Sequence, residues 1–178
     1  MYITKAKKIK ELDRLASDEW NIPSRVLMEN AGRSFVQILL GEISDHVSSV
    51  TVIAGKGNNG GDALVIARRL REKGFKVTTI VLAEEGQLNH DTRANASILK
   101  KMGTNLNWID PASWNSQNIP KDTDLIVDGI FGIGIKGPVR GGYSKIIDDI
   151  NRQPATVAAV DLPSGLPADS GKPEGTSV

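Results

Sequence analysis

Residues 49–62 read SVTVIAGKGNNGGD, a short apolar run followed by a glycine-rich stretch. The first six residues are mostly β-branched, as expected for a buried strand. A glycine-rich turn follows, and the pattern then predicts a helix from Asp62 to Lys73, with Gly74 at the C′ position. A buried strand that leads through a turn into a helix is the first half of a βαβ unit.

The alternation of strand and helix continues towards the C-terminus. The pattern predicts strands over 76–82, 105–109, 124–128 and 156–161 and helices over 91–102 and 143–151. Asp91 is the expected N-cap of one helix, and Gly103 is its stop. Because such alternation produces right-handed βαβ units, we expect an α/β fold: a Rossmann-like, doubly wound, mainly parallel sheet with helices on both faces.

Two helices are expected in front of this unit. Ile9, Leu12 and Leu15 recur at helical spacing, which predicts a short helix over 5–19. A second helix is expected to begin after Pro23, with Ser24 as its N-cap.

Composition and charge are those of an ordinary globular domain. The 178 residues are 39% hydrophobic and 24% charged, with a net charge of +1, which fits one domain and does not suggest a nucleic-acid or membrane surface. The chain has no cysteine, so thiolate catalysis, thiolate metal sites and disulfides are excluded. Since this composition fits a cytosolic protein and no apolar run is long enough to span a membrane, we expect a cytoplasmic protein.

Three polar, glycine-rich loops follow predicted strands, at 55–62, 128–138 and 161–165. In a doubly wound sheet, ligands bind outside the carboxyl ends of the strands. Glycine and aspartate also serve as plain turn residues, which would explain any one of these loops. Three such loops at one edge favour a shared site, and we expect them to meet in one pocket.

The first two loops suit phosphate groups. Gly55-x-Gly57-x-x-Gly60 lies between a strand and a helix and matches the dinucleotide-binding fingerprint, a weak signal by itself. The loop over 132–142 carries Lys136 and Arg140 among its glycines and can wrap phosphates with backbone donors, or it is a surface excursion.

Asp128 and Asp161 each end an apolar strand, where an acid is either a cap or a site residue. Pro163 weakens the cap interpretation for Asp161. Ser164 has no histidine partner in a triad-like motif, which makes serine-hydrolase chemistry a poor fit.

Four motifs resemble those of the NAD(P)H-hydrate epimerase family, also called the YjeF N-terminal domain. They are Met28-Glu29-Asn30-Ala31-Gly32, Gly57-Asn58-Asn59-Gly60-Gly61-Asp62, Val127-Asp128-Gly129-Ile130-Phe131-Gly132-Ile133-Gly134 and Val160-Asp161-Leu162-Pro163-Ser164-Gly165. They occur in the family's order and spacing, over nearly the whole chain. The resemblance implies an isomerase that interconverts the R and S forms of hydrated NADH or NADPH (NADHX and NADPHX) at C6 of the nicotinamide ring.

The resemblance also implies the site residues. Substrate would be bound by Asn58, Asn59, Gly60, Gly61, Asp62, Gly132, Ile133, Gly134, Ile135, Lys136, Gly137, Pro138, Tyr143 and Asp161. One potassium ion per subunit would be held by Asn59, Asp128 and Ser164, since hard oxygen ligands with a single carboxylate suit such a cation. We expect Asp161 to be the main catalytic acid/base, with Lys136 as a weaker catalytic candidate near the phosphate or amide.

Further expectations concern partners and domain extent. The resemblance implies a partner, an ADP- or ATP-dependent NAD(P)H-hydrate dehydratase, fused or separate. Both a monomer and a homodimer are compatible with the sequence. Family domains usually continue with another strand, so we expect residues 1–178 to be one YjeF N-terminal domain that is truncated at its C-terminal end. The front part of a bifunctional epimerase and dehydratase is one alternative for the longer protein. The alternatives are a non-catalytic nucleotide-binding module and, disfavoured because no hydride-transfer motif is evident, an NAD(P)-dependent oxidoreductase.

Overall fold

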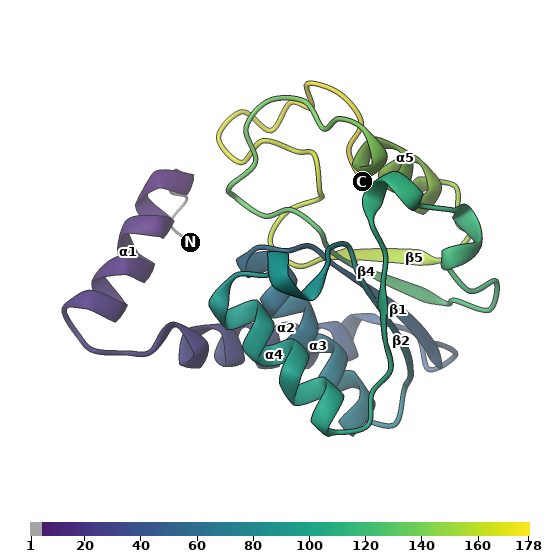
Figure 1. Cartoon of the computed structure of the whole chain (residues 1–178), viewed down its shortest axis with the longest axis horizontal. Helices are drawn as coiled ribbons and strands as arrows, with labels where there is room; N and C mark the ends of the chain where they lie inside the picture. Colours follow the sequence, from purple (N-terminus) through teal and green to yellow (C-terminus); the bar gives the residue numbers. More distant parts are fainter. Residues whose placement is uncertain (1–4) are drawn as a thin grey trace.

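The structure is a computed structural model that describes residues 5–178, and its centre is one parallel sheet (Figure 1). The strands are β1 (Ser49–Ala54), β2 (Lys76–Val81), β3 (Leu106–Trp108), β4 (Leu125–Gly129) and β5 (Thr156–Ala159). All neighbouring strands run parallel, in the order β3-β2-β1-β4-β5. This arrangement confirms the doubly wound α/β fold predicted from the alternation of strands and helices.

Helices cover both faces of the sheet, as expected (Figure 1). The helices are α1 (Ala6–Asp18), α2 (Ser24–Glu42), α3 (Asn58–Glu72), α4 (His90–Lys101) and α5 (Gly142–Asn151), with short 3-10 turns at Glu85–Gln87, Pro111–Ser113 and Ser116–Asn118. Residues of α2, α3 and α4 pack with one face of the sheet, and residues of α5 pack with the other. The alternation of side chains along β1 produces this division: Val52 belongs to the first core and Ile53 to the second.

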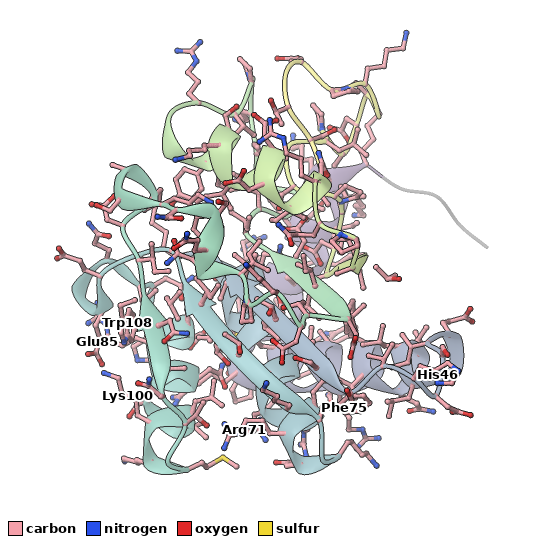
Figure 2. All side chains as sticks on the ribbon, turned by 90° about the vertical axis from the view of Figure 1, so that its right-hand side faces the viewer. His46, Arg71, Phe75, Glu85, Lys100 and Trp108 are labelled. Atoms are coloured by element: carbon pink, nitrogen blue, oxygen red, sulfur yellow. The ribbon has the colours of Figure 1, made fainter. Side chains whose placement is uncertain are left out.

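The exposed edge of the sheet at β3 carries a small charged and aromatic cluster (Figure 2). Lys100 Nζ lies 2.6 Å from a carboxylate oxygen of Glu85 and 5.0 Å from the centre of the Trp108 ring. Charged side chains and short strands at a sheet edge discourage pairing with another chain. β3 itself has only three residues.

The largest difference from the sequence prediction is the start of α3. The predicted helix begins at Asp62, but α3 begins at Asn58, so four residues expected in a turn form the first helical turn. Their glycines serve close packing: a Cβ atom at Gly60 would lie 1.8 Å from the Gly55 carbonyl oxygen. Helix propensity alone disfavours glycine, and tertiary packing overrides it here.

Two predicted caps are also wrong. α4 begins at His90, and its N-cap is Asn89, whose side chain accepts a hydrogen bond from the Thr92 N–H at 2.9 Å. Asp91 lies inside the first turn instead, where it accepts a hydrogen bond from the Ser24 hydroxyl. Ser24 is the first residue of α2 and not its N-cap, because the N-cap position is occupied by Pro23. The other predicted boundaries agree with the structure to within two residues.

Helix α1 is predicted correctly but packs differently from the other helices. It buries none of its residues, and Ile9 and Leu12 of its apolar face are 37% and 51% exposed. In Figure 1, α1 lies at the left, to one side of the sheet and the other helices. Among the described residues, no helix has the length and apolar character needed to cross a membrane.

Candidate functional site

The candidate site lies where β1 and β4 are neighbours, at the carboxyl ends of the strands. The strand order reverses there, since β1 connects to β2 on one side and the chain later returns to place β4 on the other side. Such a switch point is where ligands bind in doubly wound sheets. The Gly55 N–H donates to the Gly129 carbonyl at 3.0 Å, which holds the two loops together as they leave the sheet.

Glycines allow these loops to approach closely. A Cβ atom at Gly55 would lie 2.1 Å from the Ile130 carbonyl oxygen, and one at Gly129 would lie 2.3 Å from Cβ of Ala63. Any residue other than glycine would collide with these atoms at both positions. The start of α3 therefore lies directly against the loop after β4, with its N-terminal backbone groups at the site.

Asn59 links the first loop to the second. Its Nδ2 donates a hydrogen bond to the Phe131 carbonyl at 2.9 Å. Its Oδ1 is buried and has no hydrogen-bond partner among the described residues. A buried acceptor without a donor costs free energy, so this oxygen is suited to a cation or a donor group of a ligand.

Asp128 and Ser164 link the second loop to the third, and both are fully buried. The carboxylate of Asp128 accepts hydrogen bonds from the Ser164 N–H at 2.8 Å, the Ser164 hydroxyl at 2.6 Å and the Ile130 N–H at 3.2 Å. The Ser164 hydroxyl oxygen accepts in turn from the Phe131 N–H at 2.9 Å. Burial raises the pKa of Asp128, and the bonds from Ser164 and Ile130 oppose that rise.

Asp161 places a carboxyl group at the open side of the site. A Cβ atom at Gly132 would lie 2.4 Å from Asp161 Oδ2, which shows how closely the second and third loops approach each other. Desolvation raises the pKa of Asp161, a backbone hydrogen bond from Ile133 lowers it, and the charge of Asp13 raises it. The side chain remains accessible to solvent, so it can meet a ligand.

Asp62 is a second carboxyl group with a raised pKa. Burial, then the charges of Asp161 and Asp13, raise its pKa to about 7. The sequence predicts Asp62 as a substrate-binding residue but offers no sign of this electrostatic coupling, because Asp13 comes from α1, far away along the chain.

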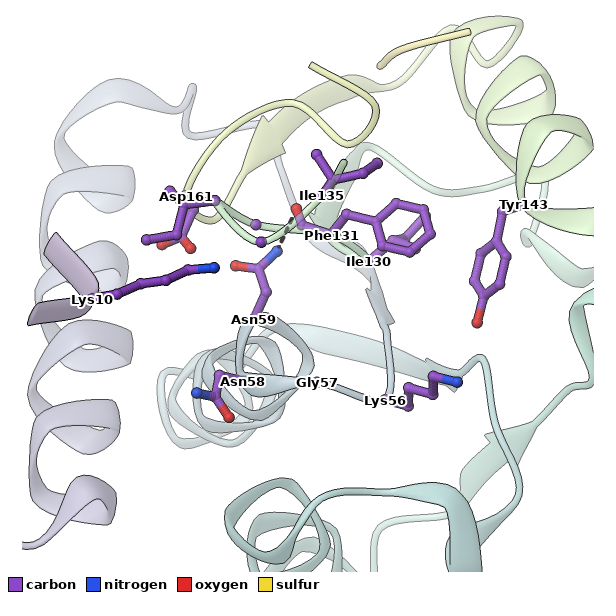
Figure 3. Close-up of a pocket in the computed structure, with 13 residues that line it drawn as sticks. Lys10, Lys56, Gly57, Asn58, Asn59, Ile130, Phe131, Ile135, Tyr143 and Asp161 are labelled. Carbon is purple, nitrogen blue, oxygen red and sulfur yellow. Dashed lines mark hydrogen bonds between the residues drawn. The ribbon is translucent and has the colours of Figure 1, made fainter. Parts of the chain in front are cut away.

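A cavity of about 590 Å³ lies beside Asn59 and Asp161 (Figure 3). Its wall does not include Asp62, Asp128 or Ser164. The predicted substrate residues in its wall are Asn58, Asn59, Gly132, Ile133, Gly134, Ile135, Tyr143 and Asp161. The rings of Phe131 and Tyr143 have their centres 4.9 Å apart and form an aromatic part of the wall, and the Tyr143 hydroxyl donates to the Leu82 carbonyl at 3.3 Å. The three loops thus meet at one cavity, as the topology predicts.

Other predicted residues lie near the cavity without lining it. Gly60 and Gly61 pack against Gly55 and Met28 in the first turn of α3. Lys136 lines a neighbouring cleft. Gly137 has a positive φ of 71°, and Pro138 packs near Gly175, so both shape the loop from outside the cavity.

The cavity wall also contains residues that were not predicted. Lys56, Gly57, Ile130 and Phe131 belong to the predicted loops, so treating each loop as a whole would have found them. Lys10 is different, because it comes from α1 and reaches towards Asn59 and Asp161 (Figure 3). No motif around Lys10 signals this position, since the placement of α1 is a tertiary property.

The chain is similar in sequence to named proteins. The bifunctional NAD(P)H-hydrate repair enzyme of Moorella thermoacetica is 42% identical over 176 residues, which cover 97% of this chain and 33% of that protein. The NAD(P)H-hydrate epimerase of Rhodopirellula baltica is 35% identical over 166 residues, covering 93% of this chain and 66% of that protein. This chain thus spans less than two thirds of the length of either relative.

A further relative and a solved structure are also similar to this chain. The NAD(P)H-hydrate epimerase of Oenococcus oeni is 36% identical over 178 residues, which cover 100% of this chain and 81% of that protein. The crystal structure of the yeast protein ynu0 superposes with a TM-score of 0.81 at 27% identity, covering 96% of this chain and 74% of that one. The model of the family described as YjeF-related protein N-terminus matches residues 24–178. This chain therefore belongs to the YjeF N-terminal family.

Proposed function

We propose that the protein is an isomerase that interconverts the R and S forms of NADHX and NADPHX at C6 of the nicotinamide ring, and so takes part in the repair of nicotinamide cofactors. One observation carries the proposal: a cavity of about 590 Å³ at the switch point joins the Asn58-Asn59 loop, an aromatic wall and the open carboxyl group of Asp161. Relatives named NAD(P)H-hydrate epimerase, at 35–37% identity, support it.

The chemistry of epimerisation needs a group that exchanges a proton. C6 of the hydrate carries a hydroxyl group and is bonded to the ring nitrogen. When a proton reaches the hydroxyl oxygen, the C6–O bond breaks, water leaves, and the nitrogen lone pair forms an iminium ion with C6. In the alternative route the hydroxyl group loses its proton to a base, the C6–N bond breaks, and the ring opens to an aldehyde. The reverse step on the other face needs a base, and one carboxyl group can act first as acid and then as base.

We assign this role to Asp161. Its raised pKa keeps the protonated form accessible, and its side chain lines the cavity. Lys136 lines the neighbouring cleft instead of the cavity that contains Asp161, so we assign Lys136 to binding and not to proton transfer.

We also propose a potassium ion held by Asn59, Asp128 and Ser164. The buried Asn59 Oδ1 without a partner supports this, since a cation would satisfy it. The set has neutral oxygens and one carboxylate, which suits a hard monovalent cation better than a tightly bound divalent one. When bound, the ion would supply positive charge that stabilises ionised Asp128 and attracts phosphate oxygens.

The partner we propose is an ADP- or ATP-dependent NAD(P)H-hydrate dehydratase, fused or separate. The relative of Moorella thermoacetica supports this, because it is named a bifunctional NAD(P)H-hydrate repair enzyme. We place the protein in the cytoplasm, since a chain without cysteine fits a reducing compartment.

The proposed activity is tested by adding the protein to a mixture enriched in one hydrate epimer and following both epimers by chromatography. We expect the ratio of R to S to relax faster than in buffer alone. A protein that binds the hydrates without changing this rate would be a nucleotide-binding module. A change in nicotinamide redox state with an added alcohol would instead indicate an oxidoreductase.

A further inference from the structure

Helix α1 contributes a cation to the cavity although it is barely attached to the rest of the fold. It buries no residue, and a hydrogen bond from the Ala6 N–H to Asp169 Oδ1 at 3.0 Å joins its first turn to the C-terminal segment. The side chain of Lys10 nevertheless extends from α1 into the cavity (Figure 3). Its Nζ would lie 3.6 Å from a Cβ atom at Gly134 in the loop after β4.

Lys10 also lies between two neighbouring hollows. A second cleft of about 360 Å³ runs between α1 and the same loop, and its wall contains Lys7, Lys10 and Lys136. Four residues, Lys10, Ile133, Gly134 and Ile135, line both hollows. A long ligand could therefore run from the cavity into the cleft past Lys10.

The charge of Lys10 is available to such a ligand. Two other cations of α1 pair within the helix: Lys8 lies 3.2 Å from Glu11, and Arg14 lies 3.1 Å from Asp18. None of the ion pairs in residues 5–178 includes Lys10. Asp161 lines the same cavity, but it forms no ion pair with Lys10, so the ammonium group can meet an anionic ligand.

We propose that Lys10 binds the diphosphate that links the two halves of the dinucleotide, so that α1 forms part of the substrate site. The inference rests on the proposed function for the identity of the substrate. The nicotinamide half occupies the cavity beside Asp161, and the adenosine half extends into the cleft that Lys7 and Lys136 line. The diphosphate then crosses the wall that both hollows share, where Lys10 lies beside the 133–135 segment.

The test uses ADP-ribose, which contains the diphosphate and lacks the nicotinamide ring. Its affinity is measured by calorimetry for the parent protein and for Lys10→Gln, Lys10→Arg and Lys8→Gln. We expect Lys10→Gln to weaken binding by at least about tenfold, the scale of a lost hydrogen bond to a charged group. Lys10→Arg should restore most of the affinity, and the control Lys8→Gln, which removes the same charge from the same helix, should bind like the parent.

Salt dependence separates a phosphate contact from a structural effect. The affinity of the parent protein should fall with rising salt concentration, and this fall should be smaller in Lys10→Gln because one cation no longer meets the diphosphate. Parent-like affinity and salt dependence in Lys10→Gln would overturn the proposal, as would an equal loss in Lys8→Gln or no binding of ADP-ribose by the parent. Because the probe is not epimerised, these results are independent of whether the protein interconverts the hydrates.

Discussion

Asp161 combines the two properties that a proton-transfer group needs, a raised pKa and access to the cavity. Asp161→Asn keeps the shape and most hydrogen bonding but cannot exchange a proton. We expect turnover of the hydrates to fall by roughly 100-fold or more, the usual scale for general acid–base catalysis, while their affinity changes little. Steady-state kinetics with a direct binding measurement tests this. If the variant interconverts R and S at near the parent rate, Asp161 only orients its loop.

Asp62 should make stability depend on pH. Its folded-state pKa of about 7 exceeds the ordinary value of 3.8, so between these values the folded protein binds more protons than the unfolded chain. The free energy of unfolding therefore decreases as the pH rises through this window. Burial and the charges of Asp161 and Asp13 raise this pKa, and the cation Lys10 lines the same cavity as Asp161.

Removing the charge of Asp62 should remove this decrease in the free energy of unfolding at high pH. We expect Asp62→Asn to melt close to the parent at about pH 5 and roughly 5 °C higher at about pH 8, since each kcal/mol corresponds to a few degrees in a domain of this size. Thermal denaturation at both pH values measures the difference. An equal difference at both pH values would show that Asp62 does not carry the effect.

Asp128 is the only carboxylate in the proposed potassium site, so it should control the response to potassium. We expect Asp128→Asn to lose activation by potassium, measured as the rate of interconversion in potassium against a large organic cation. Asp124→Asn is a matched control, because Asp124 directly precedes the same strand and also accepts backbone hydrogen bonds, from Ser48 and Ser49. Undiminished potassium dependence in Asp128→Asn would exclude this ligand set.

At the scale of elements, the first turn of α3 depends on glycine for packing. A Cβ atom at Gly60 would lie 1.8 Å from the Gly55 carbonyl oxygen, whereas one at Gly57 would meet nothing within 4 Å. We expect Gly60→Ala to lower the free energy of unfolding by about 3 kcal/mol, as overpacking against the backbone does. Gly57→Ala, in the same loop, should change it by less than about 1 kcal/mol. Chemical denaturation of both variants measures this, and equal stabilities would contradict the packing role.

The same element shows where sequence patterns lose accuracy. Glycines at 60 and 61 indicate a turn when propensity alone is considered, but in the fold they let α3 press against the strand–loop junction and Met28. Asp91 satisfies the sequence rules for an N-cap, yet Asn89 holds the position because its side chain reaches the Thr92 N–H. At α3 a tertiary contact decides the boundary. At α4 both Asn89 and Asp91 fit the local N-cap pattern, and Asp91 instead accepts a tertiary hydrogen bond from the Ser24 hydroxyl.

At the scale of the whole molecule, the sheet was predictable because its strands are apolar and short and alternate with helices, and handedness then leaves few topologies. Topology in turn predicted that loops carrying Asn59, Asp128 and Asp161 would meet. Lys10 could not be predicted in this way. Its place depends on how α1 stands beside the domain, and α1 buries nothing that a sequence pattern could identify.

The most direct test of the proposed activity starts from each pure epimer of the hydrate in turn. With the protein present, the R form and the S form should both convert, and the two time courses should converge on one common ratio of R to S at a rate proportional to protein concentration. Asp161→Asn serves as the control for contaminating activity. Conversion no faster than in buffer from either starting epimer, at a protein concentration at which hydrate binding is demonstrated, would contradict the assignment of this site to epimerisation.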